Sequence, residues 1–221
     1  MSILTGQKSN QKKEKYMFIS FEGIDFSGKS TQIELLKDYL VEHNKIVEIL
    51  REPGGTTISE KVRDILLDNK NQQMLAEAEL LLFSASRAQL VREKIRPYLE
   101  KGIYVISDRF HDSSTAYQGY GRGIPLDVVN NVHELAIGET IPDLTFFIDI
   151  PVGIANERRK KKSKGKLDRI ELGNSEFYNR VRSGYLEIAK QEERFKVIDG
   201  TQNIETIQNQ IISELELIDR R

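Results

Sequence analysis

The chain carries the stretch Gly23-Ile24-Asp25-Phe26-Ser27-Gly28-Lys29-Ser30-Thr31 between an apolar run, residues 16–21, and a helix-patterned segment, residues 32–39. A GxxxxGKS motif that follows a strand and opens a helix is the sequence context of a phosphate-binding P-loop. The structural alternative is a glycine-rich turn without a ligand, but the correct flanks make a chance match rarer. The stretch therefore indicates a P-loop NTPase fold that binds a nucleoside triphosphate.

The residue types in this loop each suit phosphate binding. Glycines allow backbone angles that turn successive N–H groups toward phosphate oxygens, and the following helix adds the positive end of its dipole. We expect Lys29 to reach the outer phosphates and the Ser30 hydroxyl to bind Mg²⁺. The predicted ATP-binding residues are the whole loop from Gly23 to Thr31.

The composition is that of one globular domain. Of 221 residues, 38% are hydrophobic and 30% are charged, which fits a buried core under a charged surface. The net charge of −1 argues against a general nucleic-acid-binding protein, and the absence of cysteine excludes disulfides and thiolate metal sites. The three histidines are widely spaced and show no metal-ligand pattern.

No apolar run approaches the roughly 20 residues that a membrane-spanning helix needs. Residues 1–15 lack the hydrophobic segment of a secretory signal, and we expect them to form a disordered polar tail. We expect a cytoplasmic protein with a single domain over residues 16–221, and neither membrane nor nucleic acid among its partners.

Five short apolar segments alternate with helical patterns along the chain. They are residues 16–21, 45–50, 103–107, 144–150 and 195–198. Near-continuous apolar strands separated by helices predict a five-stranded parallel sheet with helices on both faces, an α/β fold of three layers.

The helical segments carry boundary signals. Residues 57–60 fit a capping box at the start of a helix, and a long helical pattern over residues 75–99 should bend or restart before Pro97. Pro125 can open another helix, and an amphipathic helix over residues 204–218 closes the chain.

Charged residues follow the predicted strands. Ligands of such sheets sit beyond the carboxyl ends of the strands, which places Asp25, Arg51, Asp108, Arg109 and Asp149 at one edge. Guanidinium groups hold phosphate through two hydrogen bonds, so the two arginines indicate an acceptor that is itself phosphorylated. The structural alternative is that each pairs with the carboxylate next to it in sequence. Asp108 and Asp149 both have the position of a residue that holds Mg²⁺ through water, and the sequence does not choose between them.

Residues 158–169 read RRKKKSKGKLDR, with eight basic residues and one acidic residue. Such a run is usually a solvated surface or a polyanion-binding patch. In a P-loop phosphotransferase, a basic loop between two helices can close over the triphosphate, exclude water and stabilise charge in the transition state. We expect a lid at about residues 158–173.

Two further segments suggest an acceptor pocket. Phe83 and Arg87 lie one helical turn apart, where a ring and a guanidinium can stack on and hydrogen-bond a planar base. Tyr117 and Gln118 begin the glycine-rich stretch of residues 117–123. Taken alone, the first pair is more often a core residue beside a surface residue, and the second segment can be an ordinary turn.

Together these motifs resemble the thymidylate kinase family, whose members transfer phosphate from ATP to dTMP. The matching stretches are FEGIDFSGKSTQ (21–32), REPGGT (51–56), LLLFSASRAQ (80–89), SDRFHDSSTAYQG (107–119) and LDRIE (167–171). They follow one another in order over residues 18–199. Each stretch is a weak signal alone, and their combination is specific.

The resemblance implies residue roles by position. Phe83 would stack on thymine, Arg87 would read the base edge, and Tyr117 would crowd the 2′ position of the sugar. The implied dTMP-binding residues are Asp25, Arg51, Phe83, Arg87, Arg109, Ser114, Thr115, Tyr117 and Gln118. The implied catalytic residues are Lys29, Arg109, Asp108 and Arg159, with Arg158 added to the ATP-binding set and Mg²⁺ held by Ser30 and, through water, by Asp108.

One position departs from part of the family. Some members carry a catalytic arginine at position 26, where this chain has Phe26. The resemblance is therefore to the bacterial-type branch of the P-loop nucleoside monophosphate kinases, whose basic residues come from the lid. Phe26 is bulkier than the residue that this branch usually carries. The family resemblance also implies a homodimer.

The expected reaction is dTMP + ATP → dTDP + ADP, in dTTP biosynthesis. The phosphate of dTMP is largely dianionic near neutral pH, because its second pKa is about 6, so it can attack without a general base. Catalysis then rests on in-line positioning and charge neutralisation. One alternative is a related P-loop deoxynucleoside or nucleoside monophosphate kinase, and another is a non-catalytic nucleotide-binding switch or nucleic-acid-associated ATPase.

Overall fold

The computed structural model describes residues 16–162 and 168–219. The predicted polar tail and the central part of the predicted lid, residues 163–167, lie outside the described residues. Five parallel strands form one sheet in the order β2-β3-β1-β4-β5. They are β1 (Phe18–Glu22), β2 (Val47–Arg51), β3 (Tyr104–Asp108), β4 (Leu144–Asp149) and β5 (Phe195–Asp199). The predicted parallel sheet is confirmed.

The strand register aligns the charged strand ends. Phe21 of β1 is paired with Asp108 of β3, and Asp108 is also paired with Arg51 of β2. On the other side, Glu22 is paired with Phe147 of β4. The residues that follow β1, β2 and β3 therefore leave the sheet at the same edge, as predicted.

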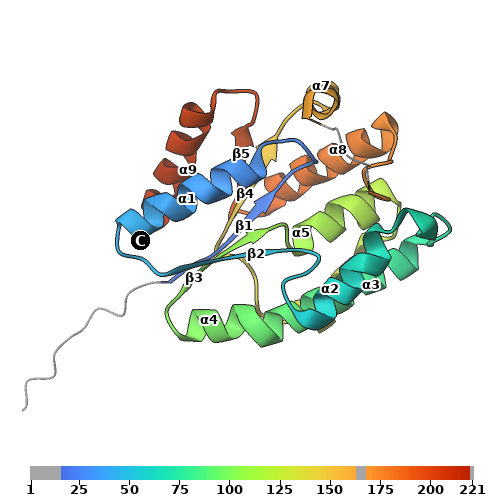
Figure 1. The fold of residues 1–221 in the computed structure, drawn as a ribbon, viewed down its shortest axis with the longest axis horizontal. Helices are drawn as coiled ribbons and strands as arrows, with labels where there is room; N and C mark the ends of the chain where they lie inside the picture. Colours follow the sequence, from blue (N-terminus) through green and yellow to red (C-terminus); the bar gives the residue numbers. More distant parts are fainter. Residues whose placement is uncertain (1–15, 163–167, 220–221) are drawn as a thin grey trace, which may run out of the picture.

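One face of the sheet is covered by α1 (Lys29–Glu42) and α9 (Ile204–Asp219), which lie side by side in Figure 1. The buried cluster between this pair and the sheet contains Phe21, Phe146 and Leu36. All three side chains are removed from water, which drives the helices onto the strands.

The opposite face is covered by α3 (Ala76–Leu90), α6 (Leu126–Ile137) and α8 (Ser175–Gln191), which completes the predicted three layers. Short elements connect these layers and the sheet. They are α2 (Thr57–Leu67), η1 (Asn69–Asn71), η2 (Val91–Ile95), α4 (Arg96–Glu100), α5 (His111–Ser114), η3 (Thr115–Gly121) and α7 (Val152–Lys162). Within the described ranges, no helix is both long and apolar enough to cross a membrane.

Three local predictions meet different outcomes. The interruption before Pro97 is confirmed as the π-helical turn η2. The capping box is wrong by one residue, because α2 is capped by Thr56, whose hydroxyl accepts a hydrogen bond from the Ser59 N–H at 3.1 Å. In the suspected turn at residues 117–123, the first five residues belong to the π-helical segment η3. A Cβ on Gly121 would lie 2.7 Å from the Phe177 ring of α8. Close packing between segments accounts for that glycine.

Candidate active site

The P-loop joins β1 to α1 with the backbone geometry that its glycines allow. Gly23 has a φ of 140°, and a Cβ there would lie 2.7 Å from the Ile148 carbonyl oxygen. Gly28, with a φ of 108°, occupies the N-cap of α1. Phe26 also has a positive φ, 64°, which is costly for a bulky side chain. The surrounding structure therefore holds this loop in a conformation that most residues disfavour.

A cavity of about 710 Å³ lies beside the P-loop, and the ends of β2 and β3 contribute to its wall. This is where parallel α/β sheets bind their ligands. Most of the predicted site residues line it, namely Asp25, Phe26, Ser27, Gly28, Lys29, Ser30, Thr31, Arg51, Phe83, Arg87, Asp108, Arg109, Ser114, Tyr117, Gln118 and Arg158. The fold therefore brings together donor-site and acceptor-site candidates that are far apart in sequence.

Four predicted site residues do not line this cavity: Gly23, Ile24, Thr115 and Arg159. The Thr115 hydroxyl instead lies 3.1 Å from Nε2 of His133. Arg159 donates to the Glu171 carbonyl oxygen at 3.4 Å and lines a separate pocket of about 20 Å³. Of the two adjacent lid arginines, Arg158 is the one at the main cavity.

Lys29 folds back onto the loop that precedes it. Its Nζ donates to the carbonyl oxygens of Gly23 at 3.1 Å and Ile24 at 3.3 Å. Burial lowers the pKa of Lys29, and the nearby Arg109 lowers it further, against the opposing effect of Asp108. The ammonium group is thus held in the loop at the cavity wall.

Arg109 is fixed from two sides. Its Nη2 donates to Oδ1 of Asp25 at 2.6 Å, and its guanidinium lies 5.1 Å from the centroid of the Tyr117 ring. Burial alone would raise the pKa of Asp25, but the charges of Arg109 and Lys29 outweigh burial and hold that pKa below its usual range. Asp25 is therefore an ionised partner for Arg109 at neutral pH.

The two arginines at the strand ends take other partners than their sequence neighbours. Arg51 pairs with Glu60 at 3.0 Å, and half of its side chain is exposed to solvent. Arg109 pairs with Asp25 rather than with Asp108. The alternative in which each arginine pairs with its sequence neighbour is therefore wrong for the described contacts. The Glu52 carboxylate, next to Arg51 in sequence, pairs with a third arginine.

That partner is Arg87, which is buried in α3. Its Nε donates to the Glu52 carboxylate at 2.6 Å, Nη1 to the Ser114 hydroxyl at 3.1 Å, and Nη2 to the Phe110 carbonyl oxygen at 3.1 Å. A guanidinium has five N–H donors, so these contacts within the described chain use only some of them. Burial raises the pKa of Glu52 to about 7, against the attraction of Arg87. Arg87 thus has a structural partner and also reaches the cavity.

The two candidate metal-site carboxylates differ in their surroundings. Asp149 accepts two hydrogen bonds from Arg182, at 2.7 and 2.8 Å, and does not line the cavity. Asp108 lines the cavity together with Ser30. Hydroxyl and carboxylate oxygens, completed by water and substrate phosphates, are the donors that Mg²⁺ prefers. The residues at the cavity therefore fit a magnesium ion.

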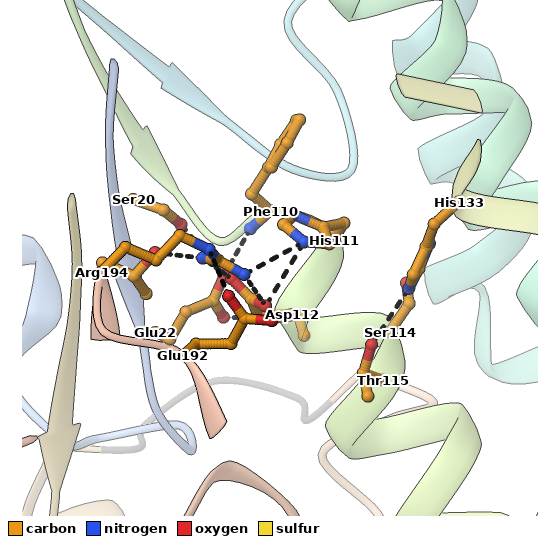
Figure 2. A network of polar contacts seen from close by, with 12 residues as sticks. Ser20, Glu22, Phe110, His111, Asp112, Ser114, Thr115, His133, Glu192 and Arg194 are labelled. Atoms are coloured by element: carbon orange, nitrogen blue, oxygen red, sulfur yellow. Dashed lines mark hydrogen bonds and ion pairs between the residues drawn. The ribbon is translucent and has the colours of Figure 1, made fainter. Parts of the chain in front are cut away.

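Sequence reasoning missed a buried polar network behind the cavity. Figure 2 shows Asp112 of α5 held by Arg194, with two hydrogen bonds of 2.8 Å. Glu22 lies beside them and accepts from the N–H of Phe110. The available signal was an acidic residue at the end of a mostly apolar strand, directly before the P-loop.

A second missed carboxylate is Glu79, in α3, which is also buried. It accepts from Gln118 at 2.9 Å and pairs with Arg169 at 2.6 Å. Glu79 therefore connects an acceptor-pocket residue to the described end of the predicted lid. Its sequence signal was weak, because a glutamate in a helix usually faces water.

Comparisons with known proteins agree on one family. The family model described as thymidylate kinase matches residues 21–211. A thymidylate kinase from Kosmotoga olearia is 50% identical over 202 residues, which are 91% of this chain and 96% of that protein. One from Thermosipho melanesiensis is 52% identical over 195 residues, which are 88% of this chain and 95% of that protein.

A solved structure supports the same conclusion. The crystal structure of thymidylate kinase from Ehrlichia chaffeensis matches with a TM-score of 0.73 at 38% identity, covering 91% of this chain and 98% of that one. These matches favour the predicted thymidylate kinase over the other nucleoside and nucleotide kinases of the same fold, and confirm the P-loop NTPase fold. The chain therefore belongs to the thymidylate kinase family.

Proposed function

We propose that the main cavity is the site where this protein transfers the γ-phosphate of ATP to dTMP, giving dTDP and ADP for dTTP biosynthesis. The observation that carries the proposal is that Lys29, Arg109, Phe83 and Arg87 all line one cavity of about 710 Å³. A cavity of this size falls within the range of small-molecule sites. It joins a phosphate-binding loop to a ring and a guanidinium suited to a nucleobase.

The ATP phosphates bind at the P-loop, residues 23–31, and at Arg158. Arg158 donates to the carbonyl oxygens of Ser27 at 3.0 Å and Gly200 at 2.8 Å, so its guanidinium lies against the loop. Ser30, which is exposed, and Thr31 line the same cavity at the start of α1, where a helix offers its unpaired N–H groups to phosphate. Arg159, which faces Glu171, takes no part in this assignment.

The acceptor dTMP binds at the part of the cavity formed by α3 and η3. Phe83 stacks on thymine, and the remaining N–H groups of Arg87 donate to the base edge. Tyr117 crowds the 2′ position of the sugar. The other assigned contacts are Asp25 near the 3′-hydroxyl, Arg51 and Arg109 at the 5′-phosphate, and Ser114 and Gln118 in the pocket wall. Thr115 is left out, because its hydroxyl contacts His133 outside the cavity.

The reaction requires the dTMP phosphate to approach the γ-phosphorus of ATP in line. The acceptor is its own nucleophile, since its phosphate is largely dianionic above a pKa of about 6. Lys29 and Arg109 neutralise charge that is spread over the transferred group in the transition state. Arg109 is already ordered by Asp25 and Tyr117, so little reorganisation is needed.

Ser30 and Asp108 would hold Mg²⁺, Ser30 directly and Asp108 through water. When bound, the ion supplies positive charge at the donor phosphates. Asp149 is excluded from this assignment by its two hydrogen bonds with Arg182.

The active protein is a homodimer in this proposal. Leu81 of α3 is 59% exposed and Leu135 of α6 is 79% exposed, and these two helices pack together. Exposed apolar side chains on adjacent helices favour a protein contact. Light scattering after size exclusion should give twice the chain mass of 25.4 kDa. A monomeric active enzyme would contradict this assignment.

An acceptor panel tests the reaction itself. ADP release with Mg-ATP is measured with dTMP, dUMP, UMP, dCMP or thymidine as the acceptor. We expect the highest kcat/KM with dTMP. Preference for thymidine or another monophosphate would keep the P-loop kinase and overturn the pocket assignment, and no acceptor-dependent release would overturn the proposed reaction.

A further inference from the structure

Glu22 ends β1, directly before the first glycine of the P-loop, and its side chain is fully buried. Its Oε1 accepts hydrogen bonds from the Ser20 hydroxyl at 3.0 Å and from the Phe110 N–H at 2.7 Å (Figure 2). Its Oε2 accepts from the hydroxyls of Ser113 at 2.5 Å and Tyr185 at 3.0 Å. All four of these donors are neutral groups.

Keeping a charged carboxylate away from water costs free energy. Burial and, to a smaller extent, the nearby Asp112 raise the pKa of Glu22 to about 7, against the opposing effects of the Ser113 hydrogen bond and the Arg109 charge. Glutamine has the same shape, could accept the Phe110 hydrogen bond, and would carry no desolvated charge. A purely structural acceptor would therefore be better served by glutamine, which suggests a use for the negative charge.

The two hydroxyls that contact Oε2 also face Arg109. Nη1 of Arg109 lies 3.3 Å from the Ser113 oxygen and 3.4 Å from the Tyr185 oxygen. These two oxygens lie 2.8 Å from each other. Glu22 and Arg109 are thus separated by a layer of two hydroxyl groups, one from α5 and one from α8.

In its ionised form, which prevails above its pKa of about 7, the Glu22 carboxylate determines which way these hydroxyls point. A carboxylate only accepts hydrogen bonds, while each hydroxyl has one proton and two lone pairs. The protons of Ser113 and Tyr185 therefore stay within the triangle that their oxygens form with Oε2 of Glu22. Their lone pairs are left for the Arg109 guanidinium, which only donates.

The other carboxylate oxygen acts on the backbone around Arg109. This residue has a positive φ of 70°, a region that costs free energy for a side chain other than glycine. Its own carbonyl oxygen accepts from the Ser107 hydroxyl at 2.7 Å. Oε1 of Glu22 accepts from the next N–H, that of Phe110. The peptide group that follows Arg109 is therefore held at its carbonyl oxygen and its N–H.

We propose that Glu22 is a positioning residue for phosphoryl transfer, which fixes the Arg109 guanidinium through the Ser113 and Tyr185 hydroxyls and through the backbone that follows it. The inference rests on the proposed phosphate-binding role of Arg109. Asp25 holds Nη2 of this guanidinium, and Glu22 determines the contacts of Nη1. The two carboxylates together set its orientation at the cavity.

Glu22→Gln is the direct test. The amide oxygen can replace Oε1 toward Phe110, so the NH₂ group replaces Oε2. Only one of the two hydroxyl protons can then stay between Ser113 and Tyr185, so the other turns toward Arg109. We expect kcat for dTMP phosphorylation to fall about tenfold to a hundredfold, the scale of a misplaced catalytic group. KM for ATP should change by less than about threefold, since the P-loop is intact.

A matched pair of serine variants separates positioning from general packing. Ser20→Ala and Ser113→Ala each remove one hydroxyl that donates to Glu22, but only Ser113 also contacts Arg109. We expect Ser113→Ala to lower kcat by at least about fivefold and Ser20→Ala to change it by less than about twofold. Equal losses in both variants would overturn the proposal.

A double-mutant cycle tests the route. In a Ser113→Ala, Tyr185→Phe background, adding Glu22→Gln should lower kcat by less than about twofold, because the hydroxyl layer is already gone. An undiminished effect would mean that Glu22 acts by another route. If Glu22→Gln does not fold, the Ser113→Ala, Tyr185→Phe enzyme still tests the two hydroxyl groups, since Glu22 stays in place. Its kcat must then fall below that of the wild type.

Failure of this inference is distinguishable from failure of the proposed function. A folded wild-type protein without dTMP-dependent ADP release overturns the proposed function and this inference with it. An active wild type whose Glu22→Gln variant keeps its kcat overturns the inference alone.

Discussion

Single residues in the cavity carry charges that are held by specific partners. Asp25 lies 2.6 Å from Arg109, and Glu52 lies 2.6 Å from the buried Arg87. Paired charges cost less to desolvate than isolated ones, and their geometry is fixed before a ligand arrives. Removing one partner should therefore affect stability and catalysis in separable ways.

Lys29→Met removes the ammonium group but keeps an unbranched side chain. We expect kcat to fall about a hundredfold or more, because the positive charge at the transferred phosphate is lost. KM for dTMP should stay within about threefold, since the acceptor pocket is untouched. Steady-state ADP release measures both constants, and thermal unfolding serves as the folding control. A variant with wild-type kcat would exclude Lys29 from the chemistry.

Arg87→Met should separate base recognition from stability. The variant leaves Glu52 as a buried carboxylate without its ion partner, which typically costs about 3–5 kcal/mol. Adding Glu52→Gln should restore most of the free energy of unfolding, measured in denaturant. KM for dTMP should stay raised about tenfold or more in both variants, because the base edge has lost its donor. A normal KM in the stable double variant would disprove the base-reading role.

At the scale of elements, the start of α2 shows how a local signal can shift. Residues 57–60 fit the capping-box pattern, but Thr56 provides the cap, and Glu60 instead accepts from the Gly55 N–H at 2.7 Å. Adjacent threonines offer two caps, one residue apart. The choice was made by tertiary contacts, since the Ser59 hydroxyl donates to the Ser86 carbonyl oxygen of α3.

Thr56→Ala and Thr57→Ala form a matched pair for this cap. We expect the first to lower the free energy of unfolding by about 1 kcal/mol, the usual cost of a lost N-cap. The second should change it by less than about 0.5 kcal/mol, because its side chain is exposed. Urea titrations of both variants measure the difference. Equal losses of unfolding free energy in the two variants would contradict Thr56 as the single cap of α2.

At the scale of the whole molecule, the sheet was predictable and the buried polar pairs were not. Short apolar runs such as residues 103–107 and 195–198 predict strands. Because ligands of parallel sheets bind beyond the carboxyl ends of the strands, the residues that follow these strands are expected at one edge. By contrast, Glu22 meets Tyr185 across 163 residues of sequence. No local pattern encodes such a contact, because it depends on how α8 packs against the sheet.

Buried titratable groups also make stability depend on pH. Burial lowers the pKa of His111 to about 4 and of His133 to about 2, against about 6.5 in the unfolded chain. The unfolded state then binds more protons, so these groups make the free energy of unfolding fall as pH drops below 6.5. Glu22 and Glu52, with pKa values raised to about 7, act oppositely between about pH 4.5 and 7.

His133→Gln should remove one histidine contribution. Relative to wild type, the variant should gain up to about 1.4 kcal/mol in free energy of unfolding for each pH unit between 6 and 5. Denaturant titrations at pH 7.5, 6 and 5 measure this change, and the difference at pH 7.5 corrects for altered packing. A difference that stays constant with pH would mean that His133 is not held neutral in the folded protein.

A crystal structure of the complex with dTMP and a non-hydrolysable ATP analogue would test directly whether donor and acceptor share the main cavity. We expect the analogue phosphates in the P-loop, thymine against Phe83 and the dTMP phosphate within hydrogen-bond distance of Arg109. A nucleoside monophosphate bound outside the cavity, or an Arg109 that touches neither phosphate, would contradict this expectation.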